Sequence, residues 1–227
     1  MTYARWQAQG NVYLVAEAPL TAAAVRAEVG DADGMLEVRG RGDDWVEIAI
    51  WNPDGSLAEM SGNGTRMAAR WLAGQTGAHV VTVRVGPREV AARMLPGGLV
   101  EQDLGPVAVG AAEEAAGIRF TPVDVGNPHA VVEGDPGDLQ RIGPLLETHP
   151  RFPQRTNVQV ARRLGHGEIE ARVWERGVGE TGSSGTSAVA VAAALGVSPA
   201  TIRFPGGELD ERIENGRAFL TGPAEPG

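Results

Sequence analysis

Two look-alike segments of this chain each place a serine hydroxyl and backbone amides at the predicted start of a helix. One segment, Ile50–Gly74, reads IWNPDGSLAEMSGNGTRMAARWLAG, and the other, Val173–Gly196, reads VWERGVGETGSSGTSAVAVAAALG. In each, a Trp is followed ten positions later by a Ser-Gly pair, Ser61-Gly62 or Ser184-Gly185, and then by an Ala-rich run. Small residues at a helix start expose first-turn amides, which favour a carboxylate or phosphate. Plain N-capping would explain one such loop. Two loops with matched spacing favour a duplicated architecture with two helix N-termini that serve one ligand.

Further polar residues lie beside these loops or beside predicted strands. Glu175 and Arg176 follow a predicted strand, where Arg176 could hold a carboxylate in a bidentate manner, although such a pair is usually a solvated ion pair. His129, in Gly126-Asn127-Pro128-His129, is a candidate acid/base assistant, although Asn-Pro also fits a simple turn. Three asparagines that each adjoin a predicted strand complete the set: Asn11, Asn52 and Asn157.

Composition excludes several classes of function. The chain has 227 residues, a net charge of −9, no cysteine and no lysine, so nucleic-acid binding, disulfides, thiolate catalysis and lysine Schiff bases are all disfavoured or excluded. Its four histidines lack metal-ligand spacing, and we therefore expect no metal site. No apolar run could span a bilayer and no signal-peptide pattern opens the chain, so we expect a cytoplasmic protein without a membrane partner. The sequence leaves a homodimer open.

The expected elements form two α+β halves. Strands are predicted at 11–16, 35–38, 45–51, 80–85 and 89–94, and again at 120–125, 130–133, 157–162, 168–174, 201–204 and 218–221. Helices are predicted at 21–29, 64–72 (with Gly74 as C-cap), 139–148 and 187–195. The stretch 106–117 reads as an exposed connection. Because 187–195 has no polar face, we expect strands to enclose that helix on all sides. The expected domains are 1–110 and 111–215, with 216–227 as a terminal strand that returns to the first domain.

Several long motifs in the same order resemble the diaminopimelate epimerases, of the pyridoxal-phosphate-independent amino-acid racemase superfamily. They are QGNVYLV from Gln9, NPDGSLAEMSGNGTR, GNPHAVV, HPRFPQRTNVQ, ERGVGET with SSGT, FPGGELD from Phe204 and FLTGP from Phe219. The resemblance implies two pseudo-symmetric domains, each a mostly antiparallel sheet wrapped around a central buried helix, with the active site in the cleft between them. It also implies two-base interconversion of LL- and meso-diaminopimelate without a cofactor, in lysine and peptidoglycan-precursor biosynthesis.

The resemblance also assigns roles by position. Ser61 and Ser184 match the two catalytic positions, and His129 and Glu175 match residues that assist them. Backbone amides of Gly62, Asn63, Gly185 and Thr186 would bind the reacting α-carboxylate. The distal amino-acid end of the substrate would be held by Asn11, Asn52, Asn127, Asn157, Glu175 and Arg176. The small-molecule partner implied is therefore an amino acid of the diaminopimelate type.

The sequence departs from the family at the catalytic pair, where the family has two cysteines and this chain has serine. A thiol titrates near 8.5, whereas an alkoxide is far harder to form, so a Ser/Ser pair should abstract an α-proton very poorly. A second departure is Gly34, where the family usually has Gln. Three explanations stay open for the serines: engineering, a catalytically silent paralogue that binds an amino acid, or a related isomerase or dehydratase reaction. A purely structural or interaction protein lacks a supporting apolar patch.

Overall fold

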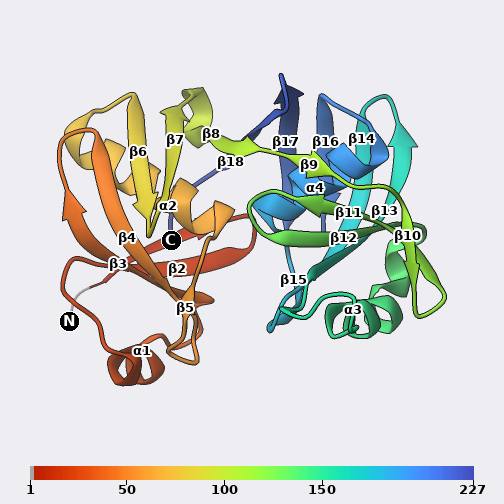
Figure 1. The fold of residues 1–227 in the computed structure, drawn as a ribbon. Helices are drawn as coiled ribbons and strands as arrows, with labels where there is room; N and C mark the ends of the chain where they lie inside the picture. The colour runs from red at the N-terminus through yellow and green to blue at the C-terminus, as the bar shows by residue number, and fades with distance from the viewer. Residues whose placement is uncertain (1–2) are drawn as a thin grey trace. The chain divides into compact units, whose positions relative to one another are not determined.

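The computed structural model describes residues 3–227 and divides into two compact units (Figure 1). Unit 1 comprises the chain up to Asp103 together with Thr221–Gly227, and unit 2 comprises Leu104–Leu220. The domain boundaries expected from the sequence, after 110 and after 215, stay a prediction. Strands β8 (Leu99–Pro106) and β18 (Arg217–Pro223) carry the chain from one unit into the other.

The elements of each unit follow the chain in a similar order. Unit 1 contains β1 (Ala4–Ala8), β2 (Asn11–Ala16), α1 (Ala22–Glu28), β3 (Gly34–Arg41), β4 (Trp45–Trp51), β5 (Leu57–Ala58), α2 (Gly62–Thr76), β6 (Val80–Val85), β7 (Arg88–Met94), the 3₁₀ turn η1 (Pro96–Gly98) and β19 (Glu225–Pro226). Unit 2 contains β9 (Ala108–Val109), β10 (Glu113–Ala115), β11 (Ile118–Asp124), β12 (Pro128–Glu133), η2 (Pro136–Asp138), α3 (Leu139–Glu147), β13 (Asn157–Gly165), β14 (Glu168–Glu175), β15 (Gly179–Thr181), α4 (Gly185–Leu195), β16 (Ala200–Phe204) and β17 (Gly207–Glu214).

Strand pairing in unit 2 repeats that of unit 1. The pairs β1–β2 and β11–β12 are antiparallel, as are β3–β4 and β13–β14, and β6–β7 and β16–β17. The pairs β2–β3 and β12–β13 are parallel, as are β4–β6 and β14–β16. Each unit is thus a mostly antiparallel sheet built on the same plan, and the α+β, pseudo-symmetric fold inferred from the sequence is confirmed.

A central helix fills each sheet. In α4 (Figure 1), the residues Gly185–Ala192 and Leu195 are buried. They pack with apolar side chains of β11, β14, β16 and β17 in one hydrophobic cluster. Helix α2 is buried over Gly62–Ala69 and again at Trp71–Ala73, against β2, β4 and β6. Strands surround the apolar run at 187–195, and this explains why it has no polar face.

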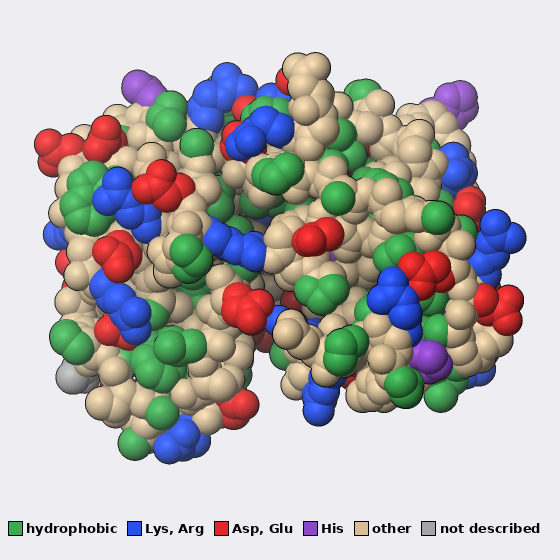
Figure 2. Space-filling model, viewed as in Figure 1, with side chains coloured by type: hydrophobic (Ala, Val, Ile, Leu, Met, Phe, Trp, Pro, Cys, Tyr) green, Lys and Arg blue, Asp and Glu red, His purple; other side chains and the backbone are tan. Residues whose placement is uncertain are grey.

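Among the differences from the sequence prediction, two concern segments that it described explicitly. Helix α2 does not end at Gly74 but continues to Thr76, and its C-cap is Gly77 in the left-handed conformation (φ 77°). The stretch 106–117 is not a plain connection, because it carries β9 and β10. Among the described residues, no helix is both long and apolar enough to cross a membrane. In Figure 2, basic and acidic side chains are interspersed over the visible surface of each unit.

Candidate active site

The first helix N-terminus is capped by Ser61. Ser61 has extended backbone angles (φ −142°, ψ 118°), and its Oγ accepts a hydrogen bond of 2.9 Å from the amide of Gly64. Its carbonyl accepts from the amide of Thr65 at 2.9 Å. The helix provides no carbonyl acceptor for the first amides of α2, such as that of Gly62, which stand at the positive end of its dipole. An anionic group can bind at this helix start.

Behind this turn, three side chains form a buried polar line. The Arg66 guanidinium donates from Nη2 to Oδ1 of Asn63 at 2.7 Å, and Asn63 donates from Nδ2 to Oδ1 of Asn11 at 2.5 Å. Arg66 and Asn63 are 0% and 2% exposed, whereas Asn11, at the start of β2, is half-buried. The sequence-predicted residues Ser61, Gly62, Asn63 and Asn11 are thus brought together in unit 1.

Asn52 and Gly34 stand at the ends of strands that flank this cluster. Asn52 lies in the β4–β5 turn, where its Nδ2 donates to Oγ of Ser56 at 2.9 Å. At Gly34, a Cβ would lie 2.4 Å from the carbonyl oxygen of Trp51 and 2.7 Å from the ring of Tyr13. Because the Trp51 carbonyl belongs to the β3–β4 ladder, this strand start has no room for the longer side chain usual in the family.

The second helix N-terminus differs from the first in its cap. Ser184 stands at the N-cap of α4 with extended backbone angles (φ −149°, ψ 127°), but its hydroxyl makes no capping hydrogen bond. Its carbonyl accepts from the amide of Ala188 at 3.0 Å. The helix therefore leaves three amides unused, those of Gly185, Thr186 and Ser187. Ser184 is 8% exposed.

His129 sits inside a polar network below this turn. Its Nε2 lies 2.9 Å from Oδ1 of Asn127, and its Nδ1 lies 2.9 Å from Nε2 of Gln159, which also donates to Oγ of Ser187 at 2.9 Å. Nδ2 of Asn127 reaches Oγ1 of Thr186 at 3.5 Å. Burial is the main cause that lowers the pKa of His129 to about 3, so the imidazole is neutral at pH 7. With both ring nitrogens occupied, His129 orients Asn127 and is not placed to take a proton from Ser184 directly.

The remaining predicted residues cluster at the end of β14. Asn157 donates from Nδ2 to the carbonyl of Pro128 at 3.1 Å and accepts at Oδ1 from the amide of Arg176 at 3.0 Å. Glu175 accepts at Oε1 from the hydroxyl of Thr181 at 2.6 Å. The Arg176 side chain reaches the carbonyl of Gln154 at 3.4 Å. Asn157 is thereby fixed at the centre of this cluster.

Strand register makes the two sets of residues equivalent. Trp51 pairs with Met35 and Trp174 with Val158, so Gly34 in unit 1 takes the place of Asn157 in unit 2. Gly34 pairs with Tyr13, and Asn157 pairs with His129. Asn11 and Asn127 each stand two residues before these partners, and each contacts the second residue of its helix, Asn63 or Thr186. The duplication seen in the loops therefore extends to individual polar contacts.

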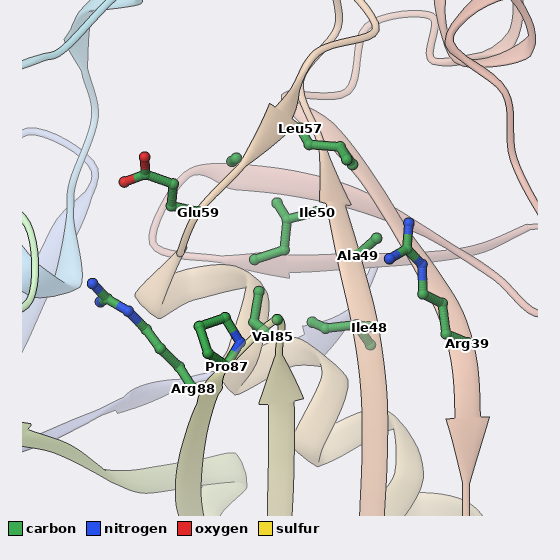
Figure 3. Close-up of a pocket in the computed structure, with 11 residues that line it drawn as sticks. Arg39, Ile48, Ala49, Ile50, Leu57, Glu59, Val85, Pro87 and Arg88 are labelled. Atoms are coloured by element: carbon green, nitrogen blue, oxygen red, sulfur yellow. The ribbon is translucent and has the colours of Figure 1, made fainter. Parts of the chain in front are cut away.

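A separate pocket of about 310 Å³ lies in unit 1 over β4. Figure 3 shows Arg39 at one end, Glu59 and Arg88 at the other, and Ile48 and Ile50 between them. None of the sequence-predicted site residues lines this pocket. The helix N-terminus of each unit, with its polar contacts, is therefore a candidate half-site.

Sequence reasoning missed the buried residues that support the site. Four such residues are each 0% exposed, and each makes a side-chain hydrogen bond to a site residue or to a residue that is itself hydrogen-bonded to one: Arg66, Gln102, Gln159 and Ser187. A detectable signal existed for Gln159, a lone polar residue between Val158 and Val160 in a predicted strand. Such a residue in an apolar strand indicates a buried hydrogen-bond network.

Comparison with known proteins identifies the family. The chain is 36% identical over 256 residues to a diaminopimelate epimerase of Synechococcus sp. (strain JA-2-3B'a(2-13)), with 97% of this chain and 89% of the relative covered. It is 43% identical over 188 residues to the diaminopimelate epimerase of Thermobifida fusca, covering 76% and 68%. The family model "Diaminopimelate epimerase" matches residues 121–225. The chain belongs to the diaminopimelate epimerase family. Its relatives are therefore isomerases, and the family resemblance seen in the sequence is confirmed.

Solved structures of other epimerases share the fold at low identity. A predicted epimerase from Pseudomonas aeruginosa matches with a TM-score of 0.75 at 18% identity, covering 99% of this chain and 96% of that one. A hydroxyproline epimerase from Agrobacterium vitis, with bound trans-4-hydroxy-L-proline, matches with a TM-score of 0.72 at 16% identity, covering 99% and 88%. At such identities the likeness concerns the fold alone.

Proposed function

We propose that this chain binds diaminopimelate as an epimerase scaffold whose Ser/Ser pair transfers the α-proton slowly or not at all. In this proposal the amides of the two helix N-termini receive the reacting carboxylate, and Ser61 and Ser184 take the two catalytic positions. Interconversion of LL- and meso-diaminopimelate, a step toward lysine and peptidoglycan precursors, is then the ancestral reaction of the scaffold. A cytoplasmic location stays a prediction.

The observation that carries the proposal is the repeated arrangement at the two helix starts. In both units a serine occupies the N-cap and small or polar residues follow it. In both, an asparagine contacts the second helical residue: Asn11 from the start of β2, and Asn127 from the turn before β12. A two-base α-proton transfer needs one group on each face of the substrate carbon, and a duplicated half-site supplies two such groups. Family membership supports the substrate class.

The chemistry of serine argues for slow turnover. A thiol near a helix N-terminus ionises at neutral pH, whereas a hydroxyl needs an adjacent base to act as a nucleophile or base. His129 is buried and neutral, with both ring nitrogens engaged by Asn127 and Gln159. The Ser61 hydroxyl oxygen already accepts from the amide of Gly64. In these contacts, no basic side chain accepts a proton from the hydroxyl of Ser61 or of Ser184.

The test is exchange of the α-hydrogen of diaminopimelate in D₂O, followed by NMR. We compare the unmodified chain with Ser61→Cys, Ser184→Cys and the double variant. The double variant should exchange at least about a hundredfold faster than the unmodified chain, and each single variant should stay well below it, because proton transfer needs a base and an acid.

Two results would contradict the proposal. Rapid exchange by the unmodified chain would show that a base other than a thiolate acts, with Glu175 the first residue to test. If the double variant binds diaminopimelate without exchange, the alternative of a silent amino-acid-binding paralogue is favoured. The alternative of a silent amino-acid-binding paralogue is supported by one structural observation: Ser61 acts as an ordinary helix cap.

A further inference from the structure

Arg66 is a buried cation without a carboxylate partner among the described residues. It is 0% exposed within α2. Its Nε donates to the carbonyl of Pro223 at 2.9 Å and its Nη2 to Asn63, while Nη1 has no hydrogen-bond partner. Burial lowers its pKa to about 10, so the guanidinium remains charged at pH 7. An unpaired buried charge is costly, and this cost calls for a function close to Arg66.

The hydrogen bonds that run from Arg66 through Asn63 to Asn11 can have only one donor-to-acceptor direction. A guanidinium can only donate, so the atom of Asn63 that faces it must be the amide oxygen. The nitrogen of Asn63 then donates to Asn11, and the atom of Asn11 that receives it must also be an oxygen. Amide oxygens and nitrogens usually have to be assigned from a network, and here the arginine settles the assignment.

This chain of hydrogen bonds ends at Asn11. The oxygen of Asn11 accepts from Asn63, and its NH₂ group makes no bond to Asn63. Asn11 is half-buried at the start of β2, next to the first turn of α2. Its equivalent in unit 2 is Asn127, which contacts His129, and His129 in turn contacts Gln159. The imidazole can exchange its donor and acceptor nitrogens while both amides turn over, so no group in this network determines which atom donates. The fixed polarity belongs to unit 1 alone.

We propose that Arg66 is a positioning residue that, through Asn63, turns the amide oxygen of Asn11 toward Asn63 and its NH₂ group toward the substrate. The substrate group that binds this NH₂ group is then an acceptor, such as a carboxylate oxygen, rather than an ammonium group. This inference rests on the proposed function, because it takes Asn11 to be a substrate-binding residue.

The polarity predicts how substitutions of Asn11 affect diaminopimelate binding, measured by calorimetry with the unmodified catalytic serines. Asn11→Asp replaces the donor by a carboxylate, so affinity should fall about tenfold or more, beyond the loss in Asn11→Ala. If Asn11 instead accepted from a substrate ammonium group, Asn11→Asp would bind as well as the unmodified chain or better. That outcome would overturn the inference.

Arg66→Met tests the positioning role itself. Without the guanidinium, Asn63 and Asn11 can reverse together, and affinity should fall about threefold to tenfold. Added to Asn11→Ala, Arg66→Met should cost almost nothing more, since the amide that it orients is already gone. Arg70→Met, the same substitution one turn along α2, is the matched control and should leave affinity unchanged. Additive losses in the double variant would assign Arg66 a merely structural role.

A measurement without ligand separates this inference from the proposed function. In side-chain amide NMR of the unmodified chain, the Asn63 NH₂ should show slowed hydrogen exchange and the Asn11 NH₂ should not. Slow exchange at Asn11 instead would overturn the polarity whatever the protein binds. If the NMR pattern is as expected but the unmodified chain does not bind diaminopimelate, the proposed function fails while the fixed polarity stands. The same spectra report whether Arg66→Met is folded, and Asn11→Asp tests the polarity if it is not.

Discussion

Ser61 and Ser184 are equivalent by position but not by bonding. The Ser61 hydroxyl is part of the fold, because it satisfies the Gly64 amide at the start of α2. The Ser184 hydroxyl makes no such bond, although the backbone angles of the two serines are similar. In α2, the N-cap side chain therefore bonds one more first-turn amide than in α4. The equivalent amide of α4 is available to another acceptor. The two half-sites should differ in their affinity for an anion.

This difference predicts unequal costs of removing the two hydroxyls. Ser61→Ala should lower the free energy of unfolding by about 1 kcal/mol, the usual value of a side-chain N-cap. Ser184→Ala should change it by less than about 0.5 kcal/mol, because no cap is lost. Urea unfolding of the two variants provides the measurement, and each variant is the other's control. Equal losses would show that Ser184 also caps its helix in solution.

At the scale of elements, the end of α2 can be tested through two glycines. Gly74 lies within the helix, and a Cβ there would meet no atom within 4 Å. Gly77 is the C-cap with φ 77°. Gly74→Ala should therefore stabilise the protein by about 0.5–1 kcal/mol, and Gly77→Ala should destabilise it by about 1 kcal/mol. Thermal unfolding of both variants checks these signs. The opposite signs would place the helix end at Gly74.

The elements that the sequence predicted well are those with a strong local pattern. The strands at Asn11–Ala16, Trp45–Trp51 and Val80–Val85 have the predicted bounds, because each is rich in β-branched or aromatic residues. Strands such as β8 (LVEQDLGP) and β17 (GELDERIE) were missed, because their charged residues alternate with few apolar ones. Pairing with neighbouring strands, which the sequence does not display, determines those elements.

The candidate site was proposed from the same kind of local pattern. Loop spacing suggested Ser61 and Ser184, and the family motifs suggested Asn11, Asn127 and His129; their roles stay predictions. The supporting residues Arg66 and Gln159 could not be assigned roles, because their contacts join residues far apart in the sequence or on different turns and strands. The absence of room at Gly34 likewise depends on where the Trp51 carbonyl and the Tyr13 ring lie.

For the whole molecule, both signs of charge mix on the surface, whereas a few charged or titratable groups of the described chain are buried without a partner of opposite charge. The net charge is −9, yet many surface carboxylates pair with arginine, as in Arg151–Glu113 and Arg162–Glu170, and both signs mix over the visible face (Figure 2). Exposed pairs of this kind contribute little to stability. The pH dependence of folding should therefore come chiefly from buried groups such as His129 and Glu211.

These two buried groups act in opposite directions of pH. His129 has a folded-state pKa of about 3 against 6.5 for the ordinary side chain, so below pH 6.5 the unfolded chain gains a proton that the folded protein refuses. Stability is then lost as pH falls from 6.5 toward 3. Burial raises the pKa of Glu211 to about 7 from 4.5, so the folded protein retains a proton that the unfolded chain releases. Stability is lost as pH rises from 4.5 toward 7.

Glu211 allows the alkaline side of this balance to be tested. Its side chain is 3% exposed in β17, and among the described residues neither carboxyl oxygen has a partner in good hydrogen-bond geometry. The Ser198 hydroxyl and the Ala200 backbone favour the ionised form, but burial outweighs them and raises the pKa. Glu211→Gln removes the charge that the folded protein must accommodate above pH 7. We expect the variant to be about 1–3 kcal/mol more stable than the unmodified chain at pH 8 and nearly equal to it at pH 4.5. Urea unfolding at the two pH values measures this, with Glu214→Gln, an exposed position on the same strand, as the control. A gain of the same size at both pH values would mean that Glu211 titrates normally and that the amide stabilises the strand for another reason.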